Sequence, residues 1–254
     1  MKTQVTANQK GGVGKSTVTA HLAYAAVAQK KRVLLVDLDP SGNLSLTFAN
    51  PERDSMPTLK ASELFWETAS ANAPEKISKY LSIIAADLPL RDILQADNSV
   101  LKIPRHWLQK MSAEYDLCLI DTPPSLSTLL VAALVAADFV LTPMQVGLYE
   151  MAGVADLLNT IKGVKRNLNT KLHHSGILLV KTNTRSKEEQ EALASLRAQY
   201  GNAILSGSLP ERAAVRAAVA KKIPVWESPR GSSHTQAASE WRTVCNQIIT
   251  GVLK

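Results

Sequence analysis

Residues 8 to 17 read NQKGGVGKST and combine glycines, lysines and hydroxyl side chains in a pattern that can bind phosphate. A glycine loop between a strand and a helix aims several backbone N–H groups at one anion, and the start of the helix adds partial positive charge. In such a loop Lys15 would reach the β- and γ-phosphates of a nucleotide, and the Ser16 hydroxyl would contact Mg²⁺. The common motif has glycine at position 9, where this chain has Gln9, and an additional lysine, Lys10, stands at the start of the loop. The stretch predicts a variant phosphate loop whose two lysines serve different purposes.

Carboxylates follow two of the apolar runs that read as strands. Asp37 and Asp39 come directly after VLLV, two residues apart, and Asp121 closes LCLI. Ligands of open parallel sheets bind at the carboxyl ends of the strands, so these side chains should lie near the phosphate loop. Taken alone, the stretch DLDP is equally compatible with a turn and a helix cap. In combination with the loop, the carboxylates predict a site for a nucleotide and a metal ion.

Alternating strand and helix patterns would position these residues. Apolar runs typical of strands that are covered on both faces occur in RVLLVD, YDLCLID, ADFVLTPM and SGILLVKTN, and a shorter one in QVTA. The order of the elements predicts an α/β fold, with a mostly parallel twisted sheet and helices on both faces. Residues 51–113, with five prolines and one strand-like run at LSIIAA, read as a less regular elaboration within a single domain of residues 1–254. Helical spacing is found over residues 15–31, 128–136, 153–167 and 187–200.

Composition limits the class of protein. The 254 residues are 45% apolar, enough for a sizeable core, but no run approaches the roughly 18 apolar residues of a membrane span. The N-terminus lacks the apolar segment of a signal peptide, and the two cysteines stand far apart, so we expect a cytoplasmic protein and no membrane partner. The net charge is +7, and residues 160–254 hold fifteen Lys and Arg against six Asp and Glu. This excess is compatible with a face that binds a polyanion and also with ordinary solvated charge.

The loop KGGVGKST resembles the deviant Walker A motif of the ParA/MinD ATPases, and most of all that of the short plasmid partition proteins. DLDPSGN resembles the family's switch I motif, with Ser41 in place of the usual glutamine, and IDTPPS resembles its Walker B and switch II segments. The resemblance extends from Val5 to about Ala238 and is weakest over residues 51–113. It implies a P-loop NTPase fold with ATP and Mg²⁺ as cofactors.

The resemblance also implies individual roles. Lys10 would cross a dimer interface to the phosphates of the partner subunit, Lys15 would bind the phosphates of its own subunit, and Asp39 would orient the attacking water; these three are the expected catalytic residues. Mg²⁺ would be held, partly through water, by Ser16, Asp37 and Asp121. The expected nucleotide-binding residues are Lys10, Gly11, Gly12, Val13, Gly14, Lys15, Ser16, Thr17, Asn183 and Pro210.

The function implied is that of a partition ATPase. ATP would drive formation of a sandwich dimer that binds DNA without sequence preference, and a ParB-like centromere-binding partner would stimulate hydrolysis, so that a plasmid or chromosome is partitioned. The chain starts almost at its first strand, so we expect no helix-turn-helix domain and no operator-specific binding; the protein would be associated with the nucleoid. Arg212 and Arg216, spaced i,i+4, should share one helix face. The basic residues expected to contact DNA are Lys181, Arg185, Lys187, Arg212, Arg216, Lys221, Lys222 and Arg230.

Two other functions within the superfamily stay open. A MinD-like positioning ATPase would act on membrane or on a protein cargo, and the final stretch SEWRTVCNQIITGVLK does carry an apolar face. Only Arg242 and Lys254 flank that face, however, so docking onto the sheet is favoured over a membrane anchor. A small-molecule enzyme would use ATP to activate a carboxylate or an amine. An electron carrier like the nitrogenase iron protein is disfavoured, because its cluster needs paired cysteines and Cys245 lies in the final helix.

Overall fold

Eight strands form one sheet in the order β3-β4-β2-β5-β1-β6-β7-β8. Neighbouring strands are parallel except for β3 and β4, so the predicted fold class is confirmed. The computed structural model describes residues 1–49, 57–68, 70–146, 148–183 and 186–254; Arg185, one of the expected DNA contacts, lies outside them. The strands are β1 Lys2–Thr6, β2 Val33–Asp37, β3 Glu75–Ser78, β4 Leu81–Ile84, β5 Leu117–Asp121, β6 Phe139–Met144, β7 His173–Thr182 and β8 Ile204–Pro210.

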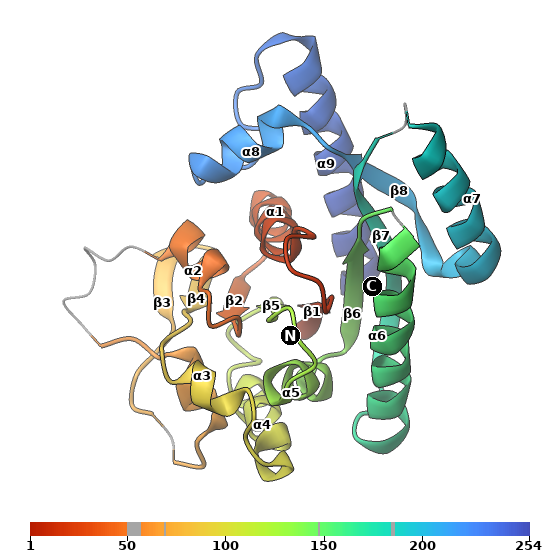
Figure 1. Ribbon diagram of the computed structural model, residues 1–254. Helices are drawn as coiled ribbons and strands as arrows, with labels where there is room; N and C mark the ends of the chain where they lie inside the picture. The colour runs from red at the N-terminus through yellow and green to blue at the C-terminus, as the bar shows by residue number, and fades with distance from the viewer. Residues whose placement is uncertain (50–56, 69, 147, 184–185) are drawn as a thin grey trace.

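Helices cover both faces of this sheet, as expected (Figure 1). On one face α1, α2, α8 and α9 pack against side chains such as Leu35 and Leu119, and on the other α4, α5 and α6 pack against Leu34 and Ile120. Adjacent residues of one strand thus serve opposite layers, because side chains alternate along a strand. The helices are α1 Lys15–Ala28, α2 Asn43–Phe48, α3 Leu90–Ile93, α4 Ile103–Lys110, α5 Thr128–Ala136, α6 Leu148–Asn167, α7 Lys187–Tyr200, α8 Ala213–Ala220 and α9 Gly231–Leu253, with short 3-10 turns at η2 Ala61–Phe65, η3 Asn98–Lys102 and η4 Gly201–Ala203.

Several predicted boundaries coincide with the structure and others do not. Helices α5 and α7 have the bounds that the sequence pattern predicts, whereas α6 starts five residues before position 153. Helix α1 was expected to continue to residue 31 but ends at Ala28, because Lys30 adopts a left-handed backbone (φ 59°) and the Lys31 N–H bonds back to the Ala26 carbonyl. This is the hydrogen-bond pattern of a Schellman-type helix end.

Two strands at the edges of the sheet lack the continuous apolar run by which the other strands are recognised in the sequence. The run LSIIAA is β4, as expected, but the antiparallel β3 beside it reads EKIS and gives no apolar signal. Strand β8 reads ILSGSLP and packs under α9. A Cβ on its Gly207 would lie 2.7 Å from Val244 Cγ2, so glycine is required there for the close approach of the helix.

The final helix docks on the body of the protein, in agreement with the prediction. Helix α9 packs against α1 and β8, and the apolar side chains of its stripe are buried. Among the described helices, none is both long and apolar enough to cross a membrane. The buried stripe comprises Trp241, Val244, Cys245, Ile248 and Val252.

Candidate nucleotide-binding site

The phosphate loop connects β1 to α1, in the position that the sequence predicts. Gly12 (φ 73°) and Gly14 (φ 91°) have left-handed backbones, which glycine adopts at little cost, and Gly14 caps the first turn of α1. The loop is held at its entrance by Asn8, whose side-chain amide donates to the Pro143 carbonyl (2.7 Å) and accepts from the Lys10 N–H (2.9 Å). The loop is therefore a defined turn whose conformation two strands of the sheet support.

Lys15, the first residue of α1, is buried. Its ammonium donates to the Lys10 carbonyl at 3.1 Å. Burial lowers the pKa of Lys15, while the negative charges of Asp121 and Asp39 raise it. The Lys15 ammonium is thus influenced by Asp121, which closes β5, and by Asp39, which follows β2.

Asp37 and Asp121 lie side by side on neighbouring strands. They are register partners on β2 and β5, and both are fully buried. Asp37 accepts hydrogen bonds from the Asp39 N–H (3.1 Å), the Ser45 N–H (2.8 Å) and the Ser45 hydroxyl (2.7 Å). Burial raises the pKa of Asp37 to about 6, although the hydrogen bonds from Ser45 and Asp39 oppose that rise. These bonds make Asp37 a support for the segment that carries Asp39 and leads into α2.

Asp121 has a different environment. Neither of its carboxylate oxygens has a hydrogen-bond partner among the described residues. Burial and the charge of Asp37 raise its pKa well above the usual range, and only the Ser16 hydroxyl and the Lys15 ammonium act in the opposite direction. A buried carboxylate without a partner, beside a serine hydroxyl, fits a cation and its water ligands. In the described part of the chain, no three His, Cys, Asp or Glu side chains are grouped in a way that could hold a metal ion.

A cavity of about 710 Å³ opens from the phosphate loop toward α8. The loop and the first turns of α1, including Ser16 and Thr17, form one wall, and the end of β8 with Pro210 forms another. Asp39 and Ser41 also line it, which brings the switch segment to the same space. Pro210 is thus placed at the cavity as expected. Asn183, exposed just beyond β7, is not among the described residues that line it.

Sequence reasoning missed two contacts to the loop. The Gln145 amide donates to the Gly12 carbonyl at 3.2 Å, and the Lys181 ammonium donates to the same oxygen at 2.5 Å. Gln145 directly follows β6, and ligands of parallel sheets bind at the carboxyl ends of the strands, so the sequence could have indicated that Gln145 lies near the site. Lys181 was predicted only as a DNA contact, and the structure brings its ammonium to the phosphate loop, in the cavity that Arg212, Arg216 and Lys222 also line.

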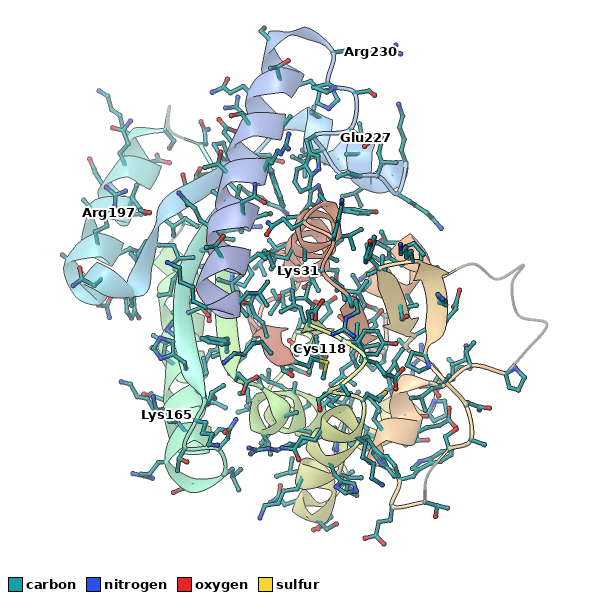
Figure 2. The ribbon with its side chains drawn as sticks, turned by 180° about the vertical axis from the view of Figure 1, so that it is seen from behind. Lys31, Cys118, Lys165, Arg197, Glu227 and Arg230 are labelled. Atoms are coloured by element: carbon teal, nitrogen blue, oxygen red, sulfur yellow. The ribbon has the colours of Figure 1, made fainter. Side chains whose placement is uncertain are left out.

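The remaining basic residues are dispersed. The expectation that Arg212 shares a helix face with Arg216 is wrong. Helix α8 begins at Ala213, so Arg212 lies just outside it, in an extended conformation (φ −136°). Arg212 is paired with Glu240 of α9 at 2.7 Å, and Arg216 is paired with Glu211. Figure 2 shows Arg230 at the turn before α9 and Lys165 at the opposite end of the molecule on α6. The positive charge that follows residue 160 is therefore not one continuous patch.

Three exposed cations stand at the two ends of the connection between α8 and α9. Lys221 and Lys222 follow α8, and Arg230 immediately precedes α9. Lys187 lies apart from them, at the start of α7. The connection itself is anchored to α1, since the Tyr24 hydroxyl donates to the Lys222 carbonyl at 2.9 Å.

A glycine loop between the first strand and first helix of a mostly parallel sheet, with acidic residues at the ends of the adjacent strands, defines the class of P-loop NTPases. A family model described as an AAA domain matches residues 1–174. The chain is 32% identical to the protein IncC of Escherichia coli over 259 residues, covering 98% of this chain and 70% of IncC. It is 34% identical to the chromosome-partitioning ATPase Soj of Thermus thermophilus over 212 residues, covering 80% and 79% of the two chains. The chain belongs to the ParA/MinD family of P-loop ATPases.

A solved structure extends this likeness to nearly the whole chain. Cobyrinic acid a,c-diamide synthase from Mycobacterium smegmatis, with bound ADP and magnesium, superposes with a TM-score of 0.77 at 26% identity. The match covers 97% of this chain and 93% of the synthase. The family fold therefore includes the C-terminal elements that lie beyond the family-model match.

Proposed function

We propose that this protein is an ATPase that partitions plasmid or chromosomal DNA. The observation that carries the proposal is the loop itself: Lys10 stands at its entrance in addition to Lys15. The loop follows β1, beside strands that are closed by Asp121 or followed by Asp39. The chromosome-partitioning ATPase Soj is a relative that is 34% identical over 80% of this chain. ATP with Mg²⁺ is the proposed nucleotide, in line with the ADP and magnesium bound to the synthase of the same fold.

The residues of the site would divide the work as follows. The Lys15 ammonium would leave the Lys10 carbonyl for the β- and γ-phosphates. Ser16 and Asp121 would hold Mg²⁺, the aspartate through water, and the ion would neutralise phosphate charge. Asp39 would orient the attacking water, and Asp37 would keep Asp39 in place through the hydrogen bond to its N–H.

Dimerisation would place a second copy against the loop. Gly11 and Gly12 are exposed, so the outer side of the loop is accessible, and Lys10 stands directly before them. Lys10 would reach the phosphates of the partner subunit, which would make the dimer dependent on ATP. Hydrolysis would dissolve the dimer, and a ParB-like protein bound to a centromere would accelerate that step.

DNA would bind to the dimer without sequence preference. Lys221, Lys222 and Arg230 are the best candidates, because they are exposed around one connection between helices. Arg212 and Arg216 are each engaged with a glutamate, which reduces the net charge they would offer to phosphate. Lys187 would contribute only if the DNA path also crosses the start of α7.

The test is Lys10→Ala. This variant should bind ATP as a monomer, because Lys15 is intact, and should lose ATP-dependent dimerisation and DNA binding in sedimentation and gel-shift experiments. Lys165→Ala is the matched control, since Lys165 is an exposed lysine near the C-terminal end of α6, at the opposite end of the molecule from Arg230 (Figure 2). A Lys10→Ala protein that dimerises with ATP and shifts DNA as the unmodified protein does would refute the mechanism.

A second candidate is an ATP-dependent enzyme that acts on a small molecule. It is favoured by the likeness to cobyrinic acid a,c-diamide synthase, which covers nearly the whole chain. ATP turnover measured with random DNA, with carboxylic acids plus an amine donor, and with anionic liposomes separates the candidates. Stimulation by the acid and amine alone would favour the enzyme, and pelleting with liposomes would favour a positioning ATPase.

A further inference from the structure

Lys181 occupies an irregular position near the end of β7. Its backbone is left-handed (φ 52°), which is rare for a residue with a side chain. Val180 pairs with Leu209, and the next pair is Thr182 with Pro210. From one pair to the next the chain advances two residues on β7 but only one residue on β8. Lys181 is therefore the extra residue of a β-bulge. Bulges redirect side chains and are frequent beside functional sites.

The redirected side chain reaches the phosphate loop. The Lys181 ammonium donates to the Gly12 carbonyl at 2.5 Å, and the Gln145 amide donates to the same oxygen at 3.2 Å. Both donors come from the ends of strands on one side of β1, and the hydrogen bond from the ammonium is the stronger, because its donor is charged. A left-handed non-glycine residue persists only where its surroundings over-determine it. Here the left-handed backbone of Lys181 directs its side chain to the Gly12 carbonyl.

Holding this carbonyl has a geometric consequence for anion binding. In a planar trans peptide unit the carbonyl and the next N–H point in opposite directions. Fixing the Gly12 oxygen toward β6 and β7 therefore fixes the direction of the Val13 N–H. A phosphate loop works only when its N–H groups converge on one point, so a fixed peptide plane improves the loop before the nucleotide arrives.

We propose that Lys181 is a positioning residue of the phosphate loop, which it holds ready for the β-phosphate through the Gly12 carbonyl. This role rests on the proposed binding of ATP but not on dimerisation or DNA. It differs from a role in DNA binding, and it differs from that of Lys15, which would move from a loop carbonyl to the phosphates while Lys181 stays on Gly12.

Binding of ADP and of adenosine to the protein without DNA tests the proposal. Lys181→Met should weaken ADP binding about ten-fold, because the peptide unit after Gly12 would then have to be ordered when ADP binds, and leave adenosine binding unchanged. Lys181→Arg should restore most of the loss. Lys165→Met, at an exposed lysine on the far end of α6, should bind both ligands normally. ADP binding at the original strength in Lys181→Met, or an equal loss for ADP and adenosine, would overturn the role.

A glycine variant separates the ammonium from the backbone. Glycine adopts φ 52° without strain, so Lys181→Gly should fold at least as well as the unmodified protein and still lose about ten-fold in ADP affinity. Normal ADP binding by this variant would contradict the proposal.

Measurements of DNA binding distinguish failure of the proposed role of Lys181 from failure of the proposed partition function. With saturating ATP, Lys181→Met should keep the salt dependence of DNA binding, whereas a slope reduced by about one per lost contact would assign Lys181 to DNA and overturn the inference. If no variant and no unmodified protein binds DNA, the partition proposal fails, and the ADP measurements still decide the role of Lys181.

Discussion

At the scale of single residues, the three acidic side chains of the site are chemically distinct although two of them are register partners. Asp37 uses its oxygens to bind Asp39 and Ser45, Asp121 has no hydrogen-bond partner among the described residues, and Asp39 lines the cavity. Burial raises the pKa of both Asp37 and Asp121. A cation beside Asp121 would offset the cost of burying two carboxylates together.

Removing the Asp39 carboxylate should separate binding from hydrolysis. Asp39→Ala removes the group that would orient water, so ATP hydrolysis should fall at least 100-fold while ATP affinity changes only a few-fold. Phosphate release and equilibrium ATP binding measure the two effects. Ser41→Ala, in the same segment, is the control, because Ser41 is bonded to Asp39 through its main-chain N–H, which the substitution keeps. Hydrolysis within a few-fold of normal in Asp39→Ala would remove this aspartate from the mechanism.

At the scale of elements, α1 contacts two segments with proposed functions. Its N-terminus carries the phosphate loop, and His21 joins its first turns to the connection between α8 and α9. His21 Nε2 accepts from the Val225 N–H at 3.2 Å, so its Nδ1 carries the proton and donates to the Thr17 carbonyl at 2.8 Å. His234 Nε2 lies 2.8 Å from the Val225 carbonyl. The α8–α9 connection is thus fastened to the helix that follows the phosphate loop.

This contact predicts a pH dependence of stability. Burial lowers the pKa of His21 to about 4, because desolvation disfavours the charged ring, and the hydrogen bond to the Thr17 carbonyl opposes the shift. The unfolded chain therefore binds the proton more tightly than the folded one between about pH 6.5 and 4. The contribution of neutral His21 to the free energy of unfolding is complete above pH 6.5. It declines by up to about 3 kcal/mol as the pH falls to 4.

The corresponding measurement is a difference between two proteins, since Asp37 also titrates in this range. The free energy of unfolding should be determined by denaturant titration at pH 7, 6, 5 and 4 for the unmodified chain and for His21→Gln. The advantage of the unmodified chain should shrink toward low pH. An advantage that is constant across this range would show that His21 is not held neutral.

At the scale of the whole molecule, the phosphate loop and the cations at the α8–α9 connection lie on the same helical layer. Figure 1 shows α8 extending beyond α1 on this side of the sheet. The cavity runs between them, from Gly11 to Lys222. A nucleotide at the loop would therefore lie in the same cavity that Lys222 of the connection lines, next to the residues that we propose bind DNA: Lys221, Lys222 and Arg230.

The salt dependence of DNA binding tests this assignment. A dimer that engages six to eight phosphates should show a slope of about −5 to −7 in a plot of log K against log salt. Lys221→Ala combined with Arg230→Ala removes four cations from a dimer, so the slope should become less negative by about 3 to 4. Lys165→Ala should leave it unchanged. Equal slopes for all three proteins would place the DNA elsewhere.

The sequence alone determined the features that depend on local spacing. The glycine loop, the carboxylates at the strand ends, the bounds of α5 and α7 and the mostly parallel sheet all follow from residue types a few positions apart. Such features are local because strand and helix periodicity and the close approach of a loop to an anion are set by neighbouring residues.

Tertiary structure decided what depends on elements distant in sequence. The contact between Lys181 and Gly12 spans 169 positions and requires a bulge that only the pairing of β7 with β8 creates. The pairing of Arg212 with Glu240 likewise arises from the packing of α9 beside α8, and it changes the charge that the sequence count implied. Polar edge strands such as β3 carry too little apolar pattern to be recognised before their partner is known. The physical reason is the same in each case: a side chain's role depends on the neighbour that folding supplies, and that neighbour is not encoded within the local stretch.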